Sequence, residues 1–142
     1  MGEGAIEGHC LCASVRLTAW PRRMEMDACQ CAMCRRWAGG VFLAVPCERI
    51  EIADETTVTV YPSSEWGERG FCRTCGSNLF WRMQDGSGDI AVSTQLFEQP
   101  ERFLFAEDIF IDHKPSNYDF AGARRRLTGA ETIAQFNGTQ EG

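Results

Sequence analysis

Eight cysteines in a chain of 142 residues constrain this protein more than any other feature of its sequence. Seven of them form three groups, and Cys47 stands alone; the groups are Cys10 and Cys12, then Cys29, Cys31 and Cys34, then Cys72 and Cys75. The N-terminus lacks the basic start and apolar run of a secretory signal peptide, so we expect a cytoplasmic location. In a reducing compartment such closely spaced cysteines indicate metal ligands more than a disulfide framework.

The number and grouping of the cysteines predict two zinc sites. A structural zinc takes four ligands in a tetrahedron, whereas a catalytic zinc keeps three protein ligands and one open position. The simplest partition joins the first and third groups into a closed site, which would hold distant parts of the chain together, and leaves the central triplet as an open site. An alternative is two closed sites of four cysteines each, with Cys47 as the eighth ligand, although a free cysteine in an apolar context is usually a small buried hydrophobe.

Composition and charge limit the classes of partner. Fourteen basic residues against twenty acidic ones give a net charge of -6, so we expect no nucleic acid as a partner. We expect no membrane span, because no run approaches the ~20 apolar residues that a bilayer requires. The basic run Arg124-Arg125-Arg126 is predicted to form one polar face of a helix rather than an RNA contact.

Hydrophobic alternation and frequent turn signals predict a mainly β fold in one domain, residues 1–142. Strands are expected around residues 15–19, 50–52, 58–61, 80–82, 90–92 and 109–111. A further strand, Val41 to Val45, is expected to end at Pro46. Helix is expected just after Cys34 and in the tail around residues 118–135. Gly39 and Gly40 are candidates for close backbone approach, and the alternative is that they stop the first of these helices.

The three cysteine motifs resemble those of the glutathione-dependent formaldehyde-activating family, which includes centromere protein V. The residues that carry the resemblance lie at 8–16, at 29–36 with Gly39 after them, and at 71–79. Order and spacing match over residues 4–120, which leaves 121–142 as a tail. The chain departs from the family pattern at Ala13, where a glycine is usual, and at Asp108 and Asn117, where a histidine and a tryptophan are frequent; Lys114 is kept.

The resemblance implies an Mss4-like fold of several small antiparallel sheets organised around zinc, with little helix. It implies two Zn²⁺ ions, a structural one on Cys10, Cys12, Cys72 and Cys75 and a catalytic one on Cys29, Cys31 and Cys34. It also implies a carbon–sulfur lyase that joins formaldehyde and glutathione into S-(hydroxymethyl)glutathione.

We therefore expect an enzyme that acts on a thiol–aldehyde adduct. Arg35 and Arg36 follow the triplet and are candidates to pair with the carboxylates of a glutathione-like thiol, as are Arg73 and Lys114, while Trp37 is a candidate pocket wall. Two alternatives are a zinc-stabilised binding module without turnover and a zinc-thiolate redox sensor. Exposed strand edges would allow a homodimer.

Overall fold

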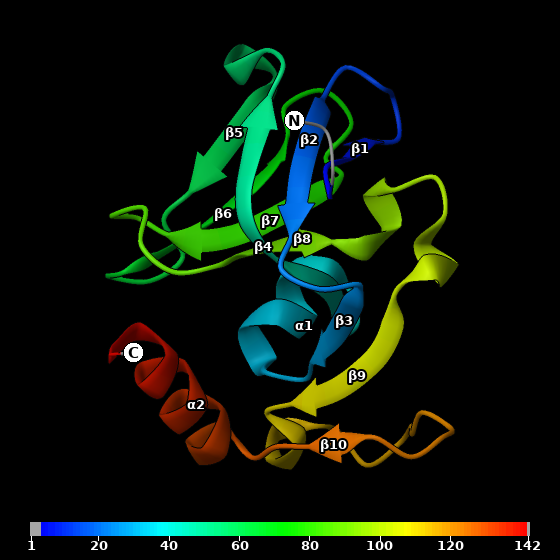
Figure 1. Ribbon diagram of the computed structural model, residues 1–142, viewed down its shortest axis with the longest axis vertical. Coiled ribbons are helices and arrows are strands. Elements are labelled where there is room, and N and C mark those ends of the chain that lie inside the picture. Colours follow the sequence, from blue (N-terminus) through cyan, green and yellow to red (C-terminus); the bar gives the residue numbers. More distant parts are fainter. Residues whose placement is uncertain (1–3, 142) are drawn as a thin grey trace.

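The computed structural model describes residues 4–141, with side chains described for residues 4–135. Ten β-strands and two α-helices lie within this range, and the strands are joined in one hydrogen-bonded network (Figure 1). The strands are β1 (Ile6–His9), β2 (Arg16–Pro21), β3 (Glu25–Cys29), β4 (Phe42–Ile52), β5 (Val58–Tyr61), β6 (Gly67–Cys72), β7 (Asn78–Met83), β8 (Ile90–Ser93), β9 (Leu104–Ile109) and β10 (Arg125–Arg126). The helices are α1 (Ala32–Ala38) and α2 (Gly129–Glu141), and four short 3-10 helices lie at Glu55–Thr57, Thr94–Leu96, Pro100–Arg102 and Ile111–His113. The predicted mainly β class with little helix is confirmed.

The strand order is β10-β9-β3-β4-β8-β7-β6-β5. Outside this path, β2 pairs with β4 and β1 pairs with β2. The expectation that Pro46 ends a strand is wrong, because β4 runs on to Ile52. One edge of β4 pairs with β3 as far as Ala44 and with β2 from Cys47 onward, so Pro46 lies between its two partners on that edge. A missing backbone N–H costs little at such a change of partner.

The C-terminal part of the chain also differs from the expectation. Strand β9 ends at Ile109, because Phe110 takes a left-handed conformation, with φ at 56°. Helix α2 begins only at Gly129, and the arginine run lies before it, so the predicted polar helix face is wrong. Arg125 and Arg126 instead form β10, which pairs in parallel with β9, and β9 pairs in parallel with β3. The remaining strand pairs are antiparallel.

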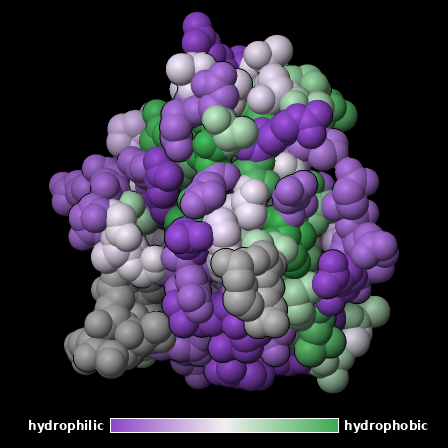
Figure 2. All heavy atoms as spheres, turned by 45° about the horizontal axis from the view of Figure 1, so that its top comes forward, coloured by the Kyte–Doolittle hydropathy of each residue, from purple (hydrophilic) through white to green (hydrophobic). Residues whose placement is uncertain are grey.

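Two apolar clusters fill the interior. The larger lies between β2, β4, β7 and β8 and includes Val15, Val45, Leu79, Phe80 and Val92, each fully buried. Close packing of this cluster needs Gly70 on β6, because a Cβ there would lie 2.3 Å from the Phe80 ring. A smaller cluster forms where α1 meets β4. Figure 2 shows apolar residues in narrow patches among hydrophilic ones on the visible part of one face. Among the described residues no helix is long and apolar enough to cross a membrane.

Candidate metal centres

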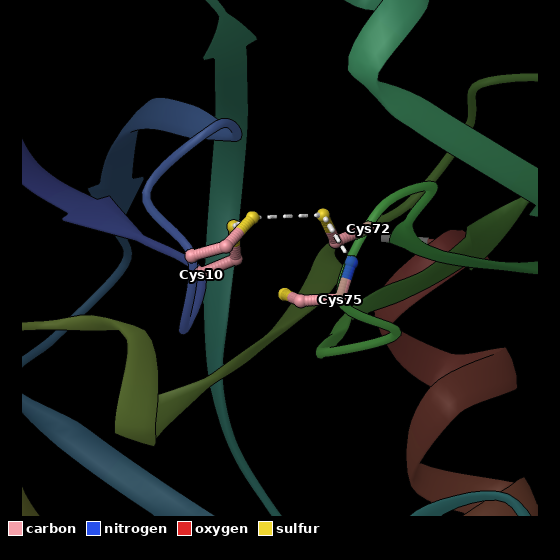
Figure 3. A group of neighbouring side chains, drawn as sticks. Cys10, Cys72 and Cys75 are labelled. Atoms are coloured by element: carbon pink, nitrogen blue, oxygen red, sulfur yellow. Dashed lines mark hydrogen bonds between the residues drawn. The ribbon is translucent and has the colours of Figure 1, made fainter.

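The first candidate metal centre joins two distant turns of the chain. Cys10 and Cys12 lie in the turn after β1, Cys72 ends β6, and Cys75 lies in the turn that follows β6; the labelled side chains point toward one another in Figure 3. The four Sγ atoms all lie within 4.8 Å of one another. The Sγ atom of Cys12 is 3.6 Å from that of Cys10 and 3.8 Å from that of Cys72. Four thiolates at the usual Zn–S bond length of ~2.3 Å are about 3.8 Å apart in a tetrahedron, so this donor set fits zinc.

Backbone amides and a hydroxyl support the thiolate form of Cys72 and Cys75 in this centre. The amides of Thr74 and Cys75 each lie 3.3 Å from the Cys72 Sγ atom, and the hydrogen bond from the Cys75 amide is the main cause of a lowered Cys72 pKa. The Ser77 hydroxyl, 3.1 Å from the Cys75 Sγ atom, lowers the pKa of Cys75 to about 5. Such outer contacts orient ligands and keep them deprotonated, as zinc binding requires.

The turn that carries the first pair of cysteines has an unusual backbone. Ala13 has φ at 66°, in the left-handed region that glycine adopts most easily. Its amide donates to the carbonyl of Cys10 at 3.0 Å and so closes the turn. This is the position at which the chain departs from the family's usual glycine, and the structure gives the physical reason for that preference.

The second candidate centre lies at the start of α1. Cys29 ends β3, Cys31 caps α1, and Cys34 lies in its first turn, so the helix begins before Cys34 rather than after it. The Cys34 amide lies 3.4 Å from the Cys31 Sγ atom, and the three Sγ atoms lie within 4.8 Å of one another. Hydrogen bonds from the Cys29 and Cys34 thiols lower the pKa of Cys31 to about 2, whereas the same network and burial raise the pKa of Cys29. Three thiolates and an open corner fit a zinc site of the catalytic kind.

Gln30, between the first two ligands of this centre, is fully buried and anchors the loop. Its side-chain amide donates to Asp108 at 3.2 Å, and its side-chain oxygen accepts a hydrogen bond from the Tyr118 hydroxyl. Asp108 in turn pairs with Arg124 at 2.9 Å, with both side chains nearly inaccessible to water. Strand β9 and the segment after it therefore hold the cysteine loop in place, a role that the sequence pattern did not reveal.

The residues proposed to contact substrate occupy different surroundings. Arg35 donates from Nε to the carbonyl of Gln30 at 2.9 Å and from Nη2 to that of His113 at 3.3 Å. Arg36 and Arg73 are exposed. Lys114 is mostly buried and already has partners, since its ammonium lies 3.0 Å from Asp119 and donates to two backbone carbonyls.

Trp37 packs in the smaller apolar cluster, edge-on to Phe42 at 5.0 Å between ring centroids. Gly39 ends α1 in a left-handed conformation with φ at 78°, which agrees with the helix-stop alternative for this residue. Sequence reasoning missed Arg69, a buried residue of β6 whose Nη1 atom lies 3.4 Å from the Cys34 Sγ atom. The sequence gives no signal for this contact, because the two residues are 35 positions apart.

Cys47 lies outside both sulfur clusters of the described residues. Its side chain is fully buried in the larger apolar cluster on β4, where its thiol donates to the Val45 carbonyl at 3.4 Å. Burial raises its pKa to about 12, so this thiol stays protonated at neutral pH. The geometry therefore favours the partition into a closed site of four cysteines and an open site of three.

A cavity of about 570 Å³ lies beside the first centre and the smaller apolar cluster. Its walls combine apolar side chains with hydrogen-bonding groups, and they include Cys10 of the first centre and Ala38 and Phe42 beside the second. His9 and Glu98 lie at this cavity, 2.8 Å apart, and the carbonyl of Cys10 together with Glu98 raises the pKa of His9. This volume is within the range of small-molecule sites, roughly 300–1,000 Å³.

Fold and donor sets thus define a small β protein with two cysteine clusters that can hold metal ions. The sequence model of the family described as glutathione-dependent formaldehyde-activating enzyme matches residues 5–113. The chain belongs to this family.

Relatives and a solved structure agree with this placement. The chain is 32% identical over 128 residues to a Schizosaccharomyces pombe protein named "Uncharacterized lyase", covering 89% of this chain and 93% of that protein. It is 26% identical over 125 residues to a Halomonas elongata protein named "Putative glutathione-dependent formaldehyde-activating enzyme", covering 78% and 77% of the two chains. A crystal structure of a Rhodobacter sphaeroides protein shares the fold, with a TM-score of 0.53 and 20% identity over 66% of this chain and 88% of that one.

Proposed function

We propose that this protein is a zinc-dependent enzyme of the carbon–sulfur lyase type that joins an aldehyde and a thiol, with formaldehyde and glutathione as the leading pair. The observation that carries the proposal is the cluster of three cysteines, Cys29, Cys31 and Cys34, which lacks a fourth protein ligand among the described residues. Three ligands and one open position are typical of catalytic zinc, whereas the four-cysteine cluster has the donor set of a structural site.

Zinc at the three-cysteine centre would supply a lowered pKa for a bound thiol, or polarise an aldehyde oxygen. The residues of the chain hold the ligands that this chemistry needs. Gln30 fixes the loop from inside the fold, and Arg35 ties α1 to the carbonyls of Gln30 and His113. Fixed ligands keep the open position in one place, so the two reactants meet in a defined geometry.

We further propose that the cavity beside the first centre receives the body of the thiol substrate. It lies next to Phe42 and Ala38, which pack against the cysteines of the second centre. The Gln95 side chain and the side-chain oxygen of Asn78 at its wall are suited to bind the amide groups of a peptide-like thiol, whereas the Ser77 hydroxyl is engaged with Cys75 and Leu11. Arg36, exposed on α1, is the better candidate for a substrate carboxylate, because Arg35 is engaged with backbone carbonyls.

The test measures the rate of exchange between free formaldehyde and its glutathione adduct by NMR, since the two also combine without a catalyst. We expect the zinc-loaded protein to accelerate exchange and Cys31→Ser to abolish the acceleration while losing one of two bound zinc ions. Cys47→Ser is the matched control, and it should retain both zinc ions and the activity. A wild-type protein that holds two zinc ions and leaves the exchange rate unchanged would refute the enzyme and favour a binding module.

A further inference from the structure

Arg69 is a buried cation beside the three-cysteine centre. It lies in the middle of β6, is 5% exposed, and its Nη1 atom is 3.4 Å from the Sγ atom of Cys34. The guanidinium group also lies over the Trp37 ring, 5.0 Å from its centroid. One face of the group thus contacts an aromatic ring of α1, and one edge points at a cysteine of the same helix.

The charge on Arg69 has no carboxylate partner among the described residues. The comparable arginines are paired: Arg82 lies 2.7 Å from Glu68, and Arg124 lies 2.9 Å from Asp108. A buried guanidinium without a counter-ion is strongly destabilising, because it loses hydration without compensation. The group that faces Arg69 is the sulfur of Cys34, which is an anion when it ligates a metal ion.

We propose that Arg69 is the counter-ion of the second metal centre and increases its affinity for zinc. A divalent cation with three thiolates carries one net negative charge, and one guanidinium neutralises it. A hydrogen bond from the guanidinium also draws electron density from the Cys34 sulfur. The inference rests on zinc binding at the three cysteines of the proposed function, but not on turnover.

Zinc affinity of the metal-loaded protein tests this role by competition with a chromophoric chelator. We expect Arg69→Met to weaken binding of one of the two zinc ions by about 10–100-fold, as losses of outer contacts of metal ligands usually do. The other zinc ion should stay as tight as in the wild type. Arg69→Lys should recover part of the affinity, because lysine keeps the charge but not the planar group.

Arg82→Met is the matched control. Arg82 lies on the neighbouring strand β7, its guanidinium is 4.6 Å from the centroid of the Phe80 ring, and it pairs with Glu68 rather than with a cysteine. We expect this variant to keep both zinc affinities. Equal weakening of both zinc ions in Arg69→Met would overturn the proposal, because it would indicate general damage to β6, and so would an unchanged affinity.

Cobalt spectra give a second readout that a purely structural role would not change. In the protein with Co²⁺ at the second centre, loss of the hydrogen bond to sulfur should move the thiolate-to-cobalt charge-transfer band to lower energy in Arg69→Met and less in Arg69→Lys. An unshifted band in both variants refutes the contact, and Arg69→Lys keeps the test available if Arg69→Met does not fold. A wild-type protein with only one zinc ion also overturns the inference, whereas two zinc ions without catalysis would refute only the proposed function.

Discussion

The ion pair between Asp108 and Arg124 offers the sharpest stability test of how the tail supports the cysteine loop. Both side chains are nearly inaccessible, at 2% and 6% exposure, and their nearest charged atoms are 2.9 Å apart. Removing one partner of a buried pair costs about 3–5 kcal/mol, because the remaining charge is left without compensation. After Arg124→Met, Asp108 keeps the Gln30 amide at 3.2 Å and Arg126 at 3.5 Å. We therefore expect a loss of about 3 kcal/mol in the free energy of unfolding.

The assay is urea unfolding at a fixed saturating concentration of free zinc, so that metal binding contributes equally to every variant. Asp108→Asn should also destabilise, and the double variant Asp108→Asn with Arg124→Met should lose at least ~1 kcal/mol less than the sum of the single losses. Arg22→Met is the surface control, because its pair with Asp89 is 45% and 28% exposed and should contribute ~1 kcal/mol or less. Additive losses in the double variant would show that the pair is not coupled and refute the reasoning.

Three further predictions follow from single residues. Cys47→Ala should keep both metal ions and lose about 1 kcal/mol of stability, and in the folded wild type Cys47 should resist thiol reagents, as mass mapping of labelled cysteines would show. Ala13→Gly should raise the free energy of unfolding by about 0.5–1 kcal/mol, because glycine adopts the left-handed conformation of residue 13 without the strain that alanine has there. A lower free energy of unfolding in urea for this variant would contradict the prediction. Burial and the nearby Glu107 raise the pKa of Asp27 to about 7, so the folded state binds the extra proton between about pH 4 and 7. The wild type should therefore lose stability relative to Asp27→Asn as the pH rises through this window, and parallel pH profiles would refute the shift.

The cysteine clusters could be predicted from the sequence because their chemistry is local. Pairs such as Cys72 and Cys75 close a turn whose amides point at sulfur. Only a few ways of dividing seven cysteines between metal sites give each metal ion a tetrahedral set of ligands. The mainly β class followed in the same way from alternation and turn residues, as in the strand at Val58–Tyr61. These signals lie within a few residues of each other, where spacing alone limits the geometry.

The features that the sequence pattern mispredicted depend on contacts between distant segments. The sequence pattern predicts that Pro46 ends a strand. Strand β4 nevertheless continues, because its pairing partner on one edge changes from β3 to β2 beside that residue. The arginine run before α2 is predicted to form a helix face, but Arg124 and Arg125 form ion pairs with Asp108 and Glu107 on β9. In both cases a tertiary partner decides the conformation, and no local pattern encodes that partner.

Strand β6 carries residues that belong to or contact both cysteine clusters. Cys72 ends this strand as a ligand of the first cluster, and Arg69 reaches the second cluster three residues earlier. On the far side of the same turn, Asn78 donates to the Trp37 carbonyl of α1 at 3.2 Å. Closure of the first cluster would thus fix the turn between β6 and β7, and Arg69 and Asn78 on these two strands reach α1, the helix that carries Cys34. The three cysteines of the second cluster lie within six residues of one another on β3 and α1, and the two clusters share no ligand. The two strands that flank the turn of the first cluster therefore both contact α1, so order in that turn supports the position of Cys34 in the second cluster.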